Sequence, residues 1–221
     1  MAGRPPGDSA DGKQRLLDAC WSLLVDTPQG ERLTIAAVCE RARCTPPTLY
    51  HHFGDLASLE RAASRRAYLA WSTELAHTCS HIVDPKARLD GHARAYVAWA
   101  QKHPDAYNVL FSQPRKEVDP NTSSLDAPIF LTLLTDLGEI HQKLPSDPSL
   151  LPLAMAYWAG VHGVASLATT LPYFPENVQE STLDIMTAAL ATHTAAESPD
   201  WAHDMARAGH TLEEDGLRAA S

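Results

Sequence analysis

Two short helical segments separated by a tight turn lie within residues 33–59, and they constrain the fold of this chain more than any other feature. Thr34 is a residue type that caps helix N-termini, and apolar residues follow it at helical spacing through 35–43. Thr45 is expected to cap a second short helix that begins at Pro46, since proline is tolerated at the first helical position. This order predicts a helix-turn-helix, in which the second helix enters the major groove of DNA.

Helical periodicity continues along nearly the whole chain. Asp55 is expected to cap a long helix that runs to about Ser80. The other expected helices cover residues 13–25, 85–103, 105–112, 129–144, 148–171 and 175–194. No β alternation, internal repeat or heptad array accompanies them. The sequence therefore predicts an all-α fold of about nine helices.

The charge of the chain is unevenly distributed. Its net charge is −9 at pH 7, and an acidic surface repels a polyanion such as DNA. Residues 1–66, however, hold nine Lys and Arg against eight Asp and Glu, whereas residues 67–221 hold nine against nineteen. The helix-turn-helix part is therefore close to neutral, and it can bind DNA if its few cations share one face.

Several other classes of protein lack support in the sequence. No apolar run approaches the ~18 residues that a membrane helix needs, and no signal-peptide pattern opens the chain. The four cysteines have no paired spacing, which indicates free thiols in a reducing cytoplasm. His77 and His81 are four residues apart, but without a third ligand nearby they are interpreted as a solvated pair. Because no catalytic motif occurs either, we expect a cytoplasmic protein that is not an enzyme and has no metal, cofactor or membrane partner.

The helix-turn-helix separates packing residues from outward polar ones. The expected packing residues are Ile35, Ala36, Val38, Cys39, Cys44, Leu49 and Phe53. The expected outward residues are Thr45, Pro46, Pro47, Thr48, Tyr50, His51 and His52. Hydroxyl and imidazole groups bind phosphates and base edges, so this surface favours DNA binding over a purely structural role.

These residues resemble the motif of the tetracycline-repressor (TetR-type) family of transcriptional regulators. The shared pattern is Thr34-Ile35-Ala36, Thr45, Thr48-Leu49-Tyr50, His52-Phe53 and Leu59, and it covers about residues 13–60. The resemblance implies that Thr34, Thr45, Thr48, Tyr50 and His52 contact the DNA backbone. It also implies that Pro47, His51 and Tyr50 lie nearest the base edges.

The chain departs from the family pattern at two positions. Arg43 stands in the turn where the family usually has glycine, and a left-handed backbone there costs a non-glycine residue about 1 kcal/mol. Leu56 stands at the start of the next helix, where the family commonly has a phosphate-binding lysine. We expect Arg43 to replace part of that charge and to join the DNA-binding residues. Arg4, Lys13 and Arg15 are further candidates for backbone or minor-groove contacts.

The expected helix at 148–171 is apolar on two faces. One stripe follows Leu150, Ala154, Tyr157, Val161, Val164 and Ala168, and a second follows Leu151, Met155, Trp158 and His162. If one stripe faces the subunit core, the other must be buried against a partner, which predicts a homodimer. The resemblance likewise implies that the last two helices form a four-helix dimer interface.

Trp158 and the segment Ala159–Gly163 are similar to a Trp/His/Gly-containing subgroup of the same family. A mostly apolar pocket between the fifth, seventh and eighth helices is expected there. Its lining would be Tyr96, Trp99, Tyr107, Phe111, Phe130, Leu134, Met155, Trp158 and His162. Plain core packing is the alternative role for each of the aromatic residues.

Five segments follow from these expectations. They are a flexible leader (1–12), a three-helix helix-turn-helix DNA-binding domain (13–54), a linking helix (55–80), a helical ligand-binding and dimerisation domain (81–196) and a polar tail (197–221). The predicted function is a ligand-responsive repressor that binds a palindromic double-stranded DNA operator as a homodimer and is released by a small, largely apolar effector. The alternative is a ligand-binding or protein-interaction module with weak or lost DNA binding, which Arg43 and Leu56 favour.

Overall fold

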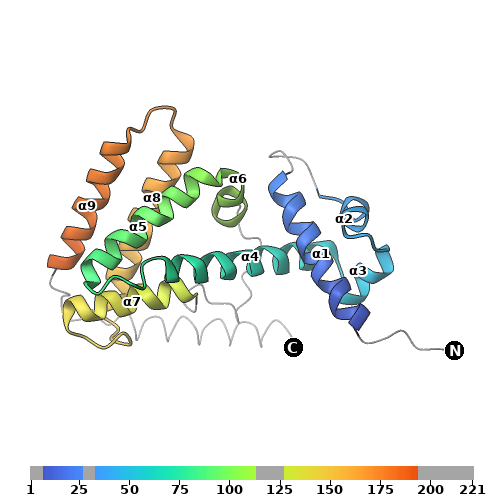
Figure 1. Cartoon of the computed structure of the whole chain (residues 1–221), viewed down its shortest axis with the longest axis horizontal. Helices are drawn as coiled ribbons and strands as arrows, with labels where there is room; N and C mark the ends of the chain where they lie inside the picture. Colours follow the sequence, from blue (N-terminus) through green and yellow to red (C-terminus); the bar gives the residue numbers. More distant parts are fainter. Residues whose placement is uncertain (1–6, 27–32, 113–126, 194–221) are drawn as a thin grey trace, which may run out of the picture. The chain divides into compact units, whose positions relative to one another are not determined.

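The computed structural model describes residues 7–26, 33–112 and 127–193, which are helical and contain no strand (Figure 1). The elements in these ranges are α1 (Gly7–Asp26), α2 (Ile35–Ala42), α3 (Pro46–Phe53), α4 (Leu56–Thr78), α5 (Pro85–Lys102), α6 (Pro104–Tyr107), the π-helical turn η1 (Asn108–Ser112), α7 (Pro128–His141), α8 (Leu150–Thr170) and α9 (Glu176–Thr192). The predicted all-α fold of about nine helices is confirmed. Arg4, the expected loop at 113–124 and the expected tail lie outside the described residues.

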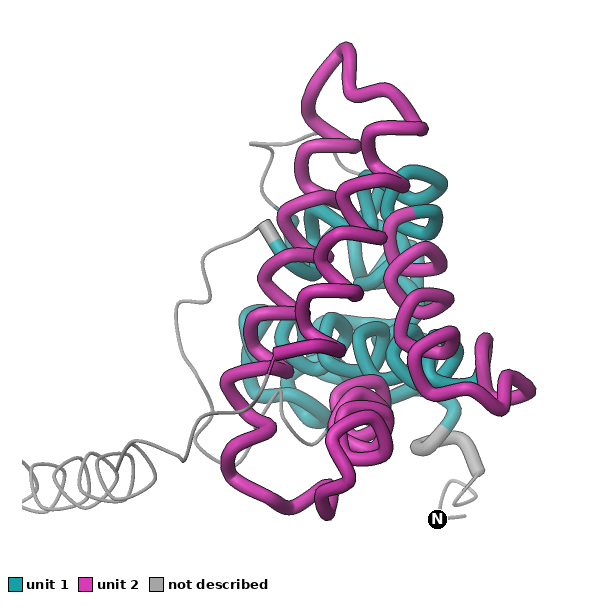
Figure 2. The backbone as a smooth tube through the Cα atoms, turned by 90° about the vertical axis from the view of Figure 1, so that its left-hand side faces the viewer, with its two compact units in different colours: residues 1–77, 98–128 teal, residues 78–97, 129–221 magenta. Residues whose placement is uncertain are grey.

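The chain divides into two compact units, which Figure 2 draws in different colours. Unit 1 comprises Met1–His77 and Ala98–Pro128, and unit 2 comprises Thr78–Val97 and Ile129–Ser221. Unit 1 contains the helix-turn-helix, and unit 2 contains α7, α8, α9 and most of α5. The functional boundaries expected from the sequence stay predictions.

An apolar core holds α1, α2 and α3 together in unit 1. Leu16, Cys20, Val38, Leu49 and Leu59 are completely buried in it. Burying a large aliphatic side chain stabilises the fold by about 1.5–3 kcal/mol. The buried Leu49 therefore fixes which face of α3 packs on the core and which face is exposed. Burial, with a smaller effect of the nearby Glu60, raises the pKa of the Cys20 thiol to about 12 and keeps it uncharged.

Capping residues account for the ends of the short helices. The Thr34 hydroxyl accepts a hydrogen bond from the backbone N–H of Ala37 at 3.2 Å, as predicted. The Asp55 carboxylate accepts one from the N–H of Ser58 at 2.6 Å, and this bond lowers the pKa of Asp55. Arg43 ends α2 with φ 52° and ψ 50°, so its backbone is left-handed, as expected for the turn.

Two local predictions about the helix-turn-helix were wrong. Ala36 is exposed, because the buried face of α2 follows Val38, Cys39 and Ala42 and position 36 lies on the other side. Thr45 has an extended backbone at the N-cap of α3, but its side chain accepts no backbone N–H. Pro46 occupies the first position of α3, as expected.

The helix expected at 105–112 is formed by α6 and the π-helical turn η1, which follow each other without a gap. The helix expected at 129–144 is shorter than predicted, because α7 ends at His141. Gln142 follows with φ 55°, and Lys143 donates its N–H to the carbonyl of Gly138 at 2.8 Å, which closes the last turn of α7. A side chain at position 138 would lie 2.8 Å from the Lys143 carbonyl oxygen, so this end requires glycine.

In unit 2, α8 and α9 pack along each other (Figure 2). Gly160 of α8 faces the Met186 side chain of α9, so a Cβ at position 160 would require this flexible side chain to move. The first apolar stripe of α8 is buried as predicted at Leu150, Ala154, Tyr157, Val161 and Val164, and Ala168 is half-buried.

The second stripe of α8 differs from the prediction. Of Leu151, Met155, Trp158 and His162, only Met155 is exposed. Trp158 and His162 are half-buried because they pack against Tyr96 of α5. The exposed stripe is turned away from them and follows Met155, Ala156, Ala159 and Leu167.

Unit 2 also buries a group of polar side chains. The Asp136 side chain is 1% exposed, and it accepts a hydrogen bond from Nε of Arg88 at 2.8 Å. His92 is buried beside it, with Nδ1 3.6 Å from the second oxygen of Asp136. Tyr157 donates its hydroxyl to the carbonyl of Leu89 at 2.7 Å, and burial is the main cause that raises its pKa well above the usual value.

α8 corrects the expectation that no segment is apolar enough to span a membrane. Its 21 residues include no Asp, Glu, Lys or Arg, and an 18-residue window within it has a mean hydropathy of 1.3. The buried core helix of a soluble protein meets the same criteria of length and composition, and α8 has one fully buried stripe. A single helix of this kind is therefore weak evidence for a membrane span.

Candidate nucleic-acid interface

The exposed face of α3 carries most of the outward residues expected from the sequence. Pro46, Pro47 and His51 are exposed, and Tyr50 is 51% exposed. Leu49 is completely buried on the opposite side and holds the helix against the core. This short helix therefore presents two proline rings, a phenol and an imidazole to solvent from a rigid base.

Three threonine hydroxyls accompany this face. Thr34 and Thr45 are exposed, and Thr48 is half-buried. The hydroxyl oxygens of Thr45 and Thr48 lie 3.3 Å apart, and either one can donate to the other. A threonine hydroxyl has one proton and two lone pairs, so each keeps hydrogen-bonding capacity for a phosphate oxygen.

The two histidines of α3 differ in their surroundings. His52 is half-buried, and its ring centroid lies 5.1 Å from that of the exposed His51. Burial, then His51 and the Lys13 ammonium, lower the pKa of His52. Its imidazole is therefore neutral at pH 7, with one nitrogen that donates and one that accepts a hydrogen bond.

The first turns of α1 pack beside α3. A Cβ on Gly12 would lie 3.6 Å from Nε2 of His52 and 3.8 Å from Cγ2 of Thr48. Lys13 holds its ammonium 5.9 Å from the centre of the Phe53 ring, at the distance of a cation–π contact. α1 therefore places one positive charge next to the exposed face of α3.

Arg43 supplies another positive charge at the end of α2. Its side chain is exposed, and within the described residues its guanidinium has no ion-pair or hydrogen-bond partner. Together with Thr34, Thr45 and the residues of α3, it completes the set expected to bind DNA. The structure brings all of these residues into α2, α3 and the turns that flank them. Their contacts with DNA stay a prediction.

Three of the expected effector-binding residues form a group in unit 2. The hydroxyl of the buried Tyr96 lies 2.9 Å from Nδ1 of His162. Trp158 packs edge-on against the Tyr96 ring, with the centroids 5.7 Å apart. Burial lowers the pKa of His162, so the imidazole is neutral at pH 7 and its Nδ1 can accept a hydrogen bond from the Tyr96 hydroxyl.

Three more of the expected residues belong to an aromatic cluster in unit 1. Trp99, Tyr107 and Phe111 lie there with Tyr68 and Trp71 of α4. The Trp71 centroid is 5.3 Å from that of Trp99 and 5.2 Å from that of Phe111. Sequence reasoning missed Tyr68 and Trp71, although two aromatic residues three positions apart on one helix face were a usable signal.

The other expected effector-binding residues differ in burial. Phe130 is buried in the core, Leu134 is half-buried, and Met155 is 47% exposed. Among the described residues, no three His, Cys, Asp or Glu side chains are grouped so that they could hold a metal ion.

Comparisons with known proteins agree with this geometry. Residues 89–190 match the family described as tetracyclin repressor-like, C-terminal domain. Rv0681 of Mycobacterium tuberculosis, an uncharacterized HTH-type transcriptional regulator, is 25% identical over 194 residues, which cover 77% of this chain and 84% of that protein. The crystal structure of the putative regulatory protein SCO4313 is 20% identical, with a TM-score of 0.62, and the match covers 83% of this chain and 98% of that one. The structure of RolR in complex with resorcinol is 14% identical, with a TM-score of 0.57 and coverages of 87% and 99%.

Proposed function

We propose that this chain, which belongs to the TetR family of DNA-binding transcriptional regulators, is a homodimeric repressor of a twofold-symmetric operator. A small, largely apolar effector binds its C-terminal part and releases it from DNA. The observation that carries the proposal is the exposed face of α3, where Pro47, Tyr50 and His51 stand outward on a helix anchored by the buried Leu49.

Each part of this face has a distinct chemical role. The imidazole of His51 presents hydrogen-bonding groups that match base edges in the major groove, and the ring of Pro47 offers an apolar contact for a thymine methyl group. The hydroxyl of Tyr50 binds a phosphate oxygen. The hydroxyls of Thr34 and Thr45 bind phosphate oxygens and fix the register of α3 on the duplex. In a dimer, two such heads engage half-sites about 34–36 Å apart.

Selection of bound duplexes from random DNA tests this function. The purified full chain is expected to enrich a palindromic sequence whose half-sites are about one helical turn apart. The double variant Tyr50→Ala, His51→Ala serves as a control, because both side chains point into solvent and their loss leaves the core unchanged. Enrichment of no sequence by the folded wild-type chain would contradict the proposal.

The exposed surface of α8 and α9 supports the dimer. Met155 and Leu167 of α8 are 47% and 44% exposed, and Val178 and Ile185 of α9 are 44% and 71% exposed. Large apolar side chains exposed on two helices that pack together are typical of an interaction site. A twofold interface is self-complementary, so the same helices of two chains can bury each other.

Light scattering after size-exclusion chromatography measures this association. Ile185→Arg is expected to convert the dimer to a monomer and to weaken operator binding, because a monomer engages a single half-site. Leu131→Arg is the matched control, since Leu131 is 52% exposed on α7, outside the proposed interface. A dimer that survives Ile185→Arg and dissociates with Leu131→Arg would place the interface elsewhere.

The Tyr96–His162 pair supports a small aromatic effector. The pair joins the buried Tyr96 to the half-buried His162 next to the indole of Trp158, so it can bind a ligand hydroxyl while the rings pack against an apolar body. RolR, which shares the fold, was solved with resorcinol, a small aromatic diol. An effector that prefers the released state shifts the population by no more than its differential affinity for the two states.

Thermal shift and operator-release measurements with phenol, resorcinol and cyclohexanol test this role. The two aromatic alcohols are expected to stabilise the chain and weaken operator binding more than cyclohexanol does. His162→Phe keeps a ring of similar size and is expected to abolish the difference. Equal responses to all three compounds in both proteins would contradict the proposed effector class.

A further inference from the structure

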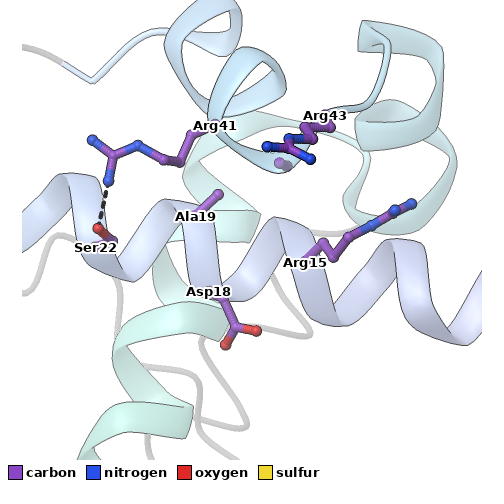
Figure 3. Close-up of a pocket in the computed structure, with 7 residues that line it drawn as sticks. Arg15, Asp18, Ala19, Ser22, Arg41 and Arg43 are labelled. Atoms are coloured by element: carbon purple, nitrogen blue, oxygen red, sulfur yellow. Dashed lines mark hydrogen bonds between the residues drawn. The ribbon is translucent and has the colours of Figure 1, made fainter.

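A hollow of about 410 Å³ opens on unit 1 between α1 and the end of α2 (Figure 3). Its lining residues are Arg15, Asp18, Ala19, Ser22, Arg41, Ala42 and Arg43. None of them belongs to α3, so the hollow is distinct from the base-reading face described above. Three of the seven are arginines.

The negative charges at this hollow are already engaged. Asp18 accepts a hydrogen bond from Arg66 at 2.6 Å, and in Figure 3 its carboxylate points away from the labelled arginines. Arg41 donates to the hydroxyl of Ser22 at 2.7 Å, with the carboxylate of Asp26 at 3.4 Å. Each of these exposed pairs is neutral, so the net charge of the opening depends on its other two arginines.

Of Arg15 and Arg43, the latter supplies the unbalanced positive charge. Arg15 has an exposed carboxylate, Asp11, at 3.6 Å, a contact that solvent screens strongly. Arg43 has no such neighbour within the described residues. Figure 3 shows Arg43 reaching over α1 between Arg41 and Arg15 in that view.

The backbone at Arg43 is that of a helix C-cap. Its φ is 52°, and Gln142, which follows α7, has the same left-handed conformation with φ 55°. What distinguishes Arg43 is its exposed guanidinium, which has no ion-pair or hydrogen-bond partner among the described residues and is therefore available to an external anion.

We propose that Arg15, Arg41 and Arg43 form a phosphate-binding hollow beside the helix-turn-helix. Guanidinium groups bind phosphate through two parallel N–H···O bonds, and three of them provide more donors than one phosphate accepts. The phosphate has two possible sources, a backbone phosphate of bound DNA or a soluble phosphorylated molecule. The first source rests on the proposed function, and the second does not.

Four variants test the hollow. Arg43→Gly and Arg43→Asn remove the charge and suit the left-handed backbone, and Arg15→Gln removes a charge from the opposite wall. Arg65→Gln is the control, because Arg65 is an exposed arginine of α4 that does not line the hollow. Circular dichroism is expected to give the same helix content for all four.

Operator binding measured at a series of salt concentrations tests whether the hollow binds a backbone phosphate of DNA. If the hollow binds a DNA phosphate, both Arg43 variants and Arg15→Gln flatten the slope of log affinity against log salt by about 0.9 for each half-site. Arg65→Gln leaves the slope unchanged.

The melting temperature in the presence of pyrophosphate, with sulfate as the reference anion, tests whether the hollow binds a soluble phosphate. If the hollow binds a soluble phosphate, pyrophosphate raises the melting temperature of the wild type and of Arg65→Gln, but not of the Arg43 variants or Arg15→Gln. The Arg43 variants and Arg15→Gln then bind the operator with the same salt dependence as the wild type. Unchanged slopes together with equal responses to pyrophosphate in all proteins would overturn the proposal. If the wild type binds no DNA, the proposed function fails, but the pyrophosphate measurement still shows whether the hollow binds phosphate.

Discussion

The α2–α3 region and the interior of unit 2 place their polar groups in opposite ways. Around α3 the core is apolar, and the hydroxyls, imidazoles and Arg43 stand at the surface. In unit 2 the surface of α8 and α9 exposes apolar side chains, while Asp136 and His92 are buried. The first arrangement suits a polar external partner such as DNA. The second suits an apolar partner and uses buried polar groups to fix how the helices pack.

The largest expected effect comes from the buried acid of unit 2. Asp136→Ala leaves the mostly buried Arg88 without its innermost carboxylate, and removing one partner of a buried pair costs about 3 kcal/mol. The urea midpoint of the variant measures this loss. Asp26→Ala is the control in unit 1, since its pair with Arg41 is exposed and such pairs contribute less than about 1 kcal/mol. Equal losses in both variants would remove the distinction between the two regions.

A smaller effect, confined to DNA binding, is expected for Tyr50→Ala. The phenol is 51% exposed, so its loss leaves stability nearly unchanged. Operator affinity should fall about tenfold, and by a similar factor on every operator variant, as for a residue that contacts phosphate. Mobility shifts on a set of single-base operator variants measure both quantities. A variant that binds as tightly as the wild type would remove Tyr50 from the interface.

Arg43→Gly is expected to stabilise unit 1. Glycine relieves the left-handed strain of about 1 kcal/mol, although its freedom in the unfolded chain offsets part of this gain. A higher melting temperature together with weaker phosphate binding would show that Arg43 binds phosphate and lowers the stability of the fold. A lower melting temperature would mean that its side chain is needed for packing.

A pH-dependent effect is expected at His162. Because burial lowers its pKa, the folded state binds the proton less well than the unfolded state, and protonation destabilises the fold. The contribution is complete above the usual pKa of 6.5 and is lost as the pH falls towards the lowered value. The stability difference between wild type and His162→Gln should therefore shrink from pH 7.5 to pH 5. A stability difference that stays constant over this range would contradict a lowered pKa of His162 in the folded chain.

The sequence predicted the helix-turn-helix because its signals are local. The Thr34 and Asp55 caps each involve an N–H three residues further along, and the left-handed Arg43 follows from the turn itself. The error at Ala36 has a physical reason: alanine is small enough for either face of a helix, so its presence does not identify the buried one.

The interior of unit 2 could not be predicted in the same way. Asp136 and Arg88 are 48 residues apart, and no local sequence pattern at either residue predicts that they pair. The exposed stripe of α8 was also misplaced. Trp158 and His162 appear suited to a partner by periodicity alone, and only the position of Tyr96 on α5 shows that they face inward. Contacts of this kind depend on tertiary packing, which a single sequence does not encode locally.

Base discrimination by His51 tests the central claim most directly. The affinities of wild type and His51→Ala are measured on an operator and on all its single-base substitutions. If the exposed face of α3 reads the major groove, His51→Ala loses discrimination at one base pair, repeated symmetrically in the two half-sites, by about 1–3 kcal/mol, and keeps it elsewhere. Identical discrimination by both proteins at every position would contradict the account.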